Sequence, residues 1–130
     1  SNNPAVVLVP HAFGLEAWGL SGLHDEWLCH RAEVANVLVV LASSGRGIEF
    51  NIGSSWAPHC PRPMVVGATD YFDFKVFDSD YGSGVNVYAP AGGPGRHVSG
   101  AWGASDTALS PRAFTDPGAA AAFAAGAAAL

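Results

Sequence analysis

Three short apolar runs occur along the chain, at residues 5–9, 37–41 and 64–66. They are rich in valine and do not alternate with polar residues. Strands buried on both faces of a parallel sheet show this pattern, whereas strands with one solvent-exposed face alternate apolar and polar side chains. The runs therefore predict three adjacent strands of one mostly parallel sheet, with residues 85–88 as a weaker fourth candidate.

The segment between the first two runs has helical periodicity. Its apolar side chains recur at spacings near three, four and seven: Leu23, Trp27, Leu28, Val34 and Ala35. This spacing places an apolar stripe on one side of a helix. A strand, a helix and a second strand in this order predict a right-handed parallel crossover. The expected fold class is therefore α/β, with residues 23–35 as the crossover helix.

Glycine, serine and proline mark the loops. Residues 45–63 and 70–81 show little periodicity, apart from a short strand candidate at 48–52, and Gly92-Gly93-Pro94-Gly95 is expected to interrupt any strand. The alanine-rich residues 118–130 predict a buried helix, because alanine has the highest helix propensity and allows close packing on a sheet. This segment is shorter than the about 20 residues that cross a bilayer.

The composition is that of one folded domain. The 130 residues are 49% apolar and 13% charged, which is far too hydrophobic for intrinsic disorder. The net charge of −5 comes without any cluster of basic residues. Nucleic acids and membranes are therefore not expected as partners, since their anionic surfaces are bound by concentrated Lys and Arg.

The histidines and cysteines do not form a recognised metal-binding pattern. Zinc ligands come in two closely spaced pairs, and the candidates here do not: His24, Cys29, His30, His59 and Cys60. His24 and Cys29 also lie on different sides of the predicted helix. We therefore expect no metal and no cofactor. Cys29 and Cys60 fit either one disulfide or two buried thiols, because the sequence does not supply the distance between them.

The segment from Met64 to Pro90 resembles one part of the subtilisin-like serine proteases. In that family a strand enters a V-G-A-T-D turn, a surface loop follows, and an F-S-N-Y-G-x-x-V-D-V-x-A-P segment leads toward the nucleophile. The matching residues keep the family's order: Val66, Gly67, Ala68, Thr69, Asp70, Phe77, Tyr81, Gly82, Val85, Val87, Ala89 and Pro90.

The resemblance covers almost the whole chain. Residues 5–14 are similar to the family's V-I-N-M-S-L-G-G, residues 36–45 to the strand that ends in A-A-G-N, and residues 97–106 to S-G-T-S-M-A-S-P around the nucleophile. The D-T-G and H-G-T-H motifs of the catalytic Asp and His have no counterpart here. The resemblance thus implies that residues 1–130 are a single partial subtilisin-like domain, the second half of the family's domain.

The resemblance also implies where a substrate cleft lies and what it lacks. The cleft-lining positions are His11, Ala12, Phe13, Gly14, Ser43, Ser44 and Trp102. Gly45 stands where the family has the Asn that donates to the oxyanion, and loss of one such donor costs about 3–4 kcal/mol of barrier. An ungapped alignment puts Trp102 at the nucleophile position, and indole has no nucleophilic oxygen.

A second alignment keeps a serine nucleophile. If three residues are inserted after Gly100, Gly103-Ala104-Ser105 matches G-T-S and Ser105 becomes the candidate nucleophile. Ser105 also has a purely structural interpretation, because a small polar residue before Asp106 and Thr107 is a common helix-start signal. The inactive interpretation is the one we favour.

Three classes of function follow. The first is a catalytically degenerate subtilisin-like domain that binds a protein or peptide, such as the missing N-terminal half or a second copy, or that serves as a structural module. The second is a fragment of an active serine endopeptidase, with Ser105 as nucleophile and with Asp and His supplied by another segment. The third is a small secreted toxin or effector that shares the α/β layout alone. The resemblance to secreted proteinase-K-like members implies an extracellular setting.

Two surface features are expected to support binding. A partial sheet leaves apolar surface uncovered, so we expect an open edge near residues 5–9 or a bare face on residues 118–130. Aromatic residues are the second feature, because they dominate interface hot spots when they face solvent. The candidates are Tyr71, Phe72, Phe74, Trp56 and Trp18.

Overall fold

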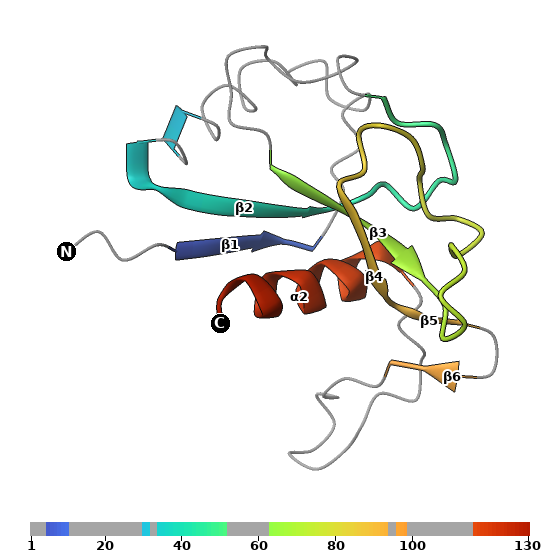
Figure 1. The fold of residues 1–130 in the computed structure, drawn as a ribbon. Coiled ribbons are helices and arrows are strands. Elements are labelled where there is room, and N and C mark those ends of the chain that lie inside the picture. The colour runs from blue at the N-terminus through green and yellow to red at the C-terminus, as the bar shows by residue number, and fades with distance from the viewer. Residues whose placement is uncertain (1–4, 11–29, 32–33, 52–62, 94–95, 99–115) are drawn as a thin grey trace, which may run out of the picture.

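The computed structural model contains one four-stranded parallel sheet and a helix packed on it (Figure 1). The strands are β1 (Ala5–Val9), β2 (Val37–Ala42), β3 (Met64–Thr69) and β4 (Val87–Pro90), in the order β1-β2-β3-β4. All three pairings are parallel, which confirms the predicted α/β class. The structure describes residues 5–10, 30–31, 34–51, 63–93, 96–98 and 116–130.

The register aligns the carboxyl ends of the strands. Val9 pairs with Leu41, Ala42 pairs with Val66, and Thr69 pairs with Pro90. Every connection between these strands therefore leaves the sheet from the same edge. In α/β sheets this edge is where ligands bind.

Strand β1 is more exposed than the sequence predicts. Val7 is 43% exposed and Leu8 is 36% exposed, whereas Val40 and Val66 in the central strands are fully buried. The prediction that residues 5–9 are buried on both faces was wrong, because β1 lies at the edge of the sheet. Within the described residues no further strand pairs with the outer edge of β1, in line with the expected open edge.

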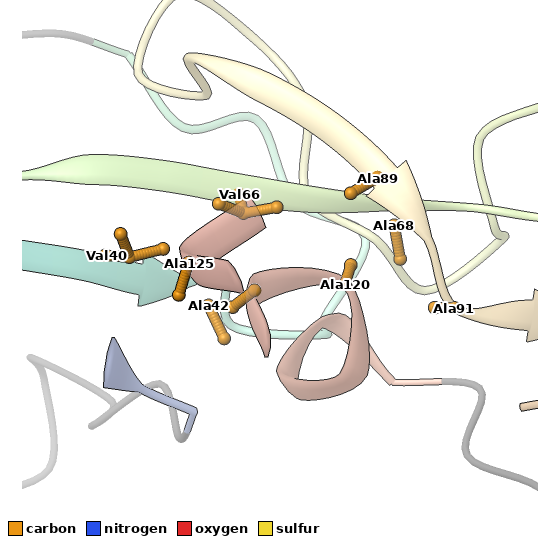
Figure 2. Packing of buried hydrophobic residues seen from close by; sticks show 9 residues of the cluster. Val40, Ala42, Val66, Ala68, Ala89, Ala91, Ala120 and Ala125 are labelled. Carbon is orange, nitrogen blue, oxygen red and sulfur yellow. The ribbon is translucent and has the colours of Figure 1, made fainter. Parts of the chain in front are cut away.

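Helix α2 (Pro117–Ala128) covers one face of the sheet and contacts all four strands. Asp116 is its N-cap, because the Asp116 side chain accepts the Ala119 N–H. Pro117 is the first helical residue, a position where the missing N–H of proline costs no hydrogen bond. Figure 2 shows the small side chains that form the interface. Because these side chains are small, the helix and the sheet approach each other closely. The buried residues of the interface are Val40, Ala42, Val66, Ala68, Ala89, Ala91, Ala120, Ala121 and Ala125.

The predicted C-terminal helix is therefore confirmed, but it is buried on one side only. Ala120 and Ala121 are fully buried, whereas Phe123 is 52% exposed on the other side. This bare face is one of the two uncovered surfaces expected from the sequence. No helix in the described residues has the length and hydrophobicity to span a membrane.

The structure describes the end of the helical connection between β1 and β2. His30, Arg31, Val34 and Ala35 are helical, and Asn36 turns the chain into β2 with a φ of 54°. Val34 is 73% exposed and Ala35 is exposed as well, so their predicted place on the buried stripe was wrong. The reason is their position in the last turn, directly before the amino edge of the sheet. Residues 23–29 lie outside the described residues.

Three loop predictions need correction. Strand β4 ends at Pro90, before the glycines, as expected, but Gly92–Gly93 then forms a separate two-residue strand, β5, paired antiparallel with β6 (Arg96–His97) in a second sheet. Glycines can form this strand because backbone pairing needs no side chain and Gly92 adopts a φ of 82°.

The fourth strand starts at Val87 rather than Val85, because the Val85 N–H donates to the Gly82 carbonyl oxygen in a turn. Residues 48–51 form a single bridge, Glu49 with Tyr81.

Candidate functional site

The candidate site lies at the carboxyl edge of the sheet, where the N-terminus of α2 meets the ends of β1 and β2 (Figure 1). A Cβ added at Gly45, which follows β2, would lie 3.6 Å from Cδ of Pro117. A Cβ at Gly118 would lie 2.5 Å from the carbonyl oxygen of Pro10, which follows β1. The first turn of α2 therefore packs directly against both strand ends.

The turn after β2 is fixed by a buried carboxylate. Asp80 is 2% exposed, and its Oδ2 accepts the Ser44 N–H at 2.6 Å. Its Oδ1 accepts the N–H groups of Arg46 and Ile48, both at 3.2 Å. The Ser43 N–H donates to Val66 O at 2.8 Å. A buried charge is stable when several donors surround it, so these bonds hold the turn in one conformation.

A second layer of bonds holds Asp80 itself. Ser79 is fully buried, and its Oγ accepts the Ala68 N–H at 2.9 Å and donates to Asp80 O at 3.3 Å. The Tyr88 hydroxyl donates to the same carbonyl at 3.2 Å. Burial of the ring, and then the negative charge of Asp80, raise the pKa of Tyr88 above its ordinary value of 10.0. These contacts connect the ends of β2 and β3 to β4.

The sequence patterns did not single out Ser79 and Asp80, although both residues shape the site. They stand at the letters S-N of the family's F-S-N-Y-G segment, just before the matching Tyr81. The available signal was this short match, with Asp in place of Asn. Its structural meaning depends on residues far away in the sequence, since the donors belong to Ser44, Arg46 and Ile48.

Gly45 has a backbone that few other residues adopt. Its φ is 69°, in the left-handed region that glycine occupies without steric cost. Gly45 lies against Pro117 and brings no side-chain donor to the edge. The N-cap of α2 is Asp116, whose carboxylate accepts the Ala119 N–H at 3.2 Å. Negative charge thus already occupies the end of α2 that would otherwise attract an anion.

The hydroxyl groups at this edge do not form a nucleophile–base pair in the part of the chain that the structure describes. Ser43 Oγ and Ser44 Oγ are buried and have no hydrogen-bond partner. His30 is the one histidine whose side chain is described, and it precedes β2 at the opposite edge of the sheet. A serine becomes a nucleophile when a base accepts its proton, so neither hydroxyl has the arrangement needed for acyl transfer.

An apolar hollow of about 550 Å³ lies beside the first turns of α2. It provides space for a side chain of a partner or for a small apolar group, since its walls are mostly alanine, proline and valine. The lining residues are Pro10, Val98, Asp116, Gly118, Ala119, Ala122 and Phe123.

Three consecutive predicted site residues lie among the described residues. Ser43, Ser44 and Gly45 form the turn that follows β2 at the carboxyl edge, and their roles in a cleft stay predictions. The roles of the others stay predictions because they lie outside the described residues: His11, Ala12, Phe13, Gly14, Trp102, Ser105, Cys29, Cys60, Trp18 and Trp56.

No group of three or more metal-binding side chains occurs within the described ranges. Asp80 does not act as an open ligand there, because its oxygens accept backbone N–H groups.

Comparison with known proteins identifies the fold. No protein-family model matches the chain, and no curated protein matches it. Among solved structures, the chain is similar to a cold-adapted subtilisin-like serine proteinase, with a TM-score of 0.59 and 24% sequence identity over 78% of this chain. The fold is subtilisin-like. The chain spans 33% of that proteinase, so the likeness concerns a part of the proteinase and establishes the fold alone.

Proposed function

We propose that the chain is a catalytically inactive subtilisin-like domain that acts by binding a protein or peptide partner. The observation that carries this proposal is the contact between Gly45 and the start of α2. At this point an active site would need a donor to the oxyanion. The chain has instead a glycine without a side chain, next to a helix end that the Asp116 carboxylate already caps.

The position of α2 supports a third alignment of the nucleophile motif. In the resemblance, S-G-T-S-M-A-S-P leads into the helix that follows the nucleophile, and α2 starts at Pro117. If Pro117 is the final proline of that motif, residues 110–117 read S-P-R-A-F-T-D-P, and Ala113 stands at the nucleophile position. A methyl group cannot attack a carbonyl. In this alignment Trp102 and Ser105 both precede the motif.

Labelling with a fluorophosphonate probe tests the proposal, because such a probe reacts with serines that a neighbouring base activates. We expect the full chain to remain unlabelled and to hydrolyse no casein or synthetic peptide, while an active serine protease in the same buffer is labelled. The matched variants are Ser105→Ala and Ser44→Ala. Labelling that disappears in Ser105→Ala and persists in Ser44→Ala would restore the active-fragment hypothesis.

The proposal includes an extracellular setting, which the resemblance to proteinase-K-like members implies. Expression of the protein from its own gene with a C-terminal tag, followed by fractionation of cells and medium, tests this setting. Recovery of the tagged protein from the medium supports it, and retention in the cell lysate contradicts it.

A further inference from the structure

Residues 70–81 lie in the connection between β3 and β4 (Figure 1). Several large aromatic side chains of this segment are exposed to solvent. We call the exposed side chains of this segment the aromatic loop surface. Phe77 is 96% exposed, Phe74 is 70% exposed and Phe72 is 63% exposed. Soluble domains rarely expose large apolar side chains together unless the surface binds something. The complete set is Tyr71, Phe72, Phe74, Phe77 and Tyr81.

The aromatic loop surface is held in place by its own backbone. Asp70 Oδ1 accepts the N–H groups of Phe72 at 2.8 Å and Phe74 at 3.0 Å, and the Asp70 N–H donates to Phe74 O at 2.8 Å. The rings of Tyr71 and Phe72 lie 3.9 Å apart between centroids. The hydrogen bonds hold the backbone of residues 70–74 in one conformation before any partner arrives, which lowers the backbone entropy lost on binding.

The charges of the same segment are mostly acidic. Asp73 and Asp78 are exposed, and their carboxylates have no ion-pair partner among the described residues. Lys75 is the one cationic residue in the segment, and its Nζ is directed to the chain's own carbonyl oxygens. It donates to Val76 O at 2.9 Å, Phe77 O at 3.3 Å and Ser79 O at 2.8 Å.

We propose that the aromatic loop surface binds a basic segment of a partner protein, in which arginines alternate with apolar residues. Exposed carboxylates and aromatic faces together select a guanidinium group, which pairs with a carboxylate through two N–H groups and stacks on a ring. The apolar residues of the segment would cover the phenylalanines. Acidic peptides, nucleic acids and anionic lipids are repelled by the same carboxylates.

The inference rests on the proposed function, because it names the class of partner for a domain that acts by binding. The absence of catalysis and the binding of a basic partner can be contradicted independently of each other. Fluorophosphonate labelling tests the absence of catalysis, and peptide binding tests this surface. A chain that is unlabelled and also ignores basic peptides would keep the inactive domain and lose the basic partner.

Fluorescence anisotropy with three labelled peptides tests the inference: one alternates Arg and Leu, one Lys and Leu, and one Glu and Leu. We expect saturable binding of the arginine peptide, weaker binding of the lysine peptide and none of the glutamate peptide. Added salt should weaken the binding, since exposed charges contribute to it. Equal binding of the arginine and glutamate peptides would overturn the inference.

Variants assign the binding to this surface. Phe72→Ala, Phe74→Ala and Phe77→Ala combined should weaken the arginine peptide by about 30-fold or more, the scale of a lost hot spot. Asp73→Asn and Asp78→Asn should each weaken it by roughly threefold and reduce the salt dependence. Phe123→Ala, which removes an exposed ring on α2, should change nothing.

If lipid or a second copy of the chain occupied the aromatic loop surface, the binding experiments would give different results. Binding of the wild-type chain to zwitterionic vesicles, lost in the triple phenylalanine variant, would assign the surface to a lipid interface and overturn the inference. Self-association that the triple variant abolishes, in a chain that ignores the arginine peptide, would assign it to a second copy. Circular dichroism and a urea midpoint like those of the wild type show that the variants fold.

Discussion

The backbone N–H of Ser44 and the carboxylate of Asp80 are 36 positions apart in the sequence and 2.6 Å apart in the fold. Through this bond the segment before β4 fixes the turn after β2, at the edge of the sheet where ligands bind in α/β folds. The same carboxylate reaches Arg46 and Ile48, so one side chain positions the whole turn around Gly45.

Replacement of Asp80 by alanine should destabilise the protein by about 3–5 kcal/mol, because three buried or part-buried N–H groups would lose their acceptor. A urea titration followed by circular dichroism measures the loss. Asp78→Ala is the matched control, since Asp78 is exposed two residues away, and it should change stability by less than about 0.5 kcal/mol. Equal effects of the two substitutions would contradict the role given to Asp80.

Tyr88 should be the source of a tyrosine ionisation above pH 10, because burial and Asp80 raise its pKa from 10.0. The folded state holds the phenol proton more tightly than the unfolded state does. The stability that Tyr88 contributes is therefore complete below about pH 10 and is lost as pH rises through the raised pKa. Phenolate absorbance of the wild type and of Tyr88→Phe measures this, and a titration curve unchanged by the substitution would refute it.

Gly45 should tolerate asparagine better than valine. Asparagine accepts a positive φ, whereas a β-branched side chain at φ 69° costs about 1–2 kcal/mol more. Thermal unfolding of Gly45→Asn and Gly45→Val compares the two. Gly45→Asn also restores the amide of the family's motif, and we expect no hydrolysis of peptides to accompany it, because the nucleophile and base remain missing.

The two glycines of α2 should respond in opposite directions to alanine. Gly118→Ala places a methyl group 2.5 Å from Pro10 O, so the helix or the strand end must shift, at a cost of about 1–3 kcal/mol. Gly126 has open space around it, and Gly126→Ala should stabilise by about 0.5–1 kcal/mol through helix propensity. Differential scanning calorimetry measures both. Stabilisation by both substitutions would mean that α2 does not pack against Pro10 as described.

The sequence by itself determined the main elements of the fold. Valine-rich runs give β2 and β3 because β-branched side chains pack well in strands buried on both faces. The alanine-rich C-terminal segment gives α2, because helix propensity acts locally along the chain. The V-G-A-T-D turn and the Y-G segment also lie in local sequence, which is why the resemblance could point to the subtilisin-like fold.

The tertiary structure decided the exposure and contacts of those elements. Val7 and Val34 are apolar but exposed, since their burial depends on what covers an edge strand and a helix end. The bond between Ser44 and Asp80 and the contact of Gly45 with Pro117 join residues far apart in the sequence. Local patterns do not encode such pairs, because hydrogen-bond geometry and close packing depend on where the folded backbone places each group. The sequence therefore predicted a loop that begins at Gly45, and the fold determined what surrounds this glycine.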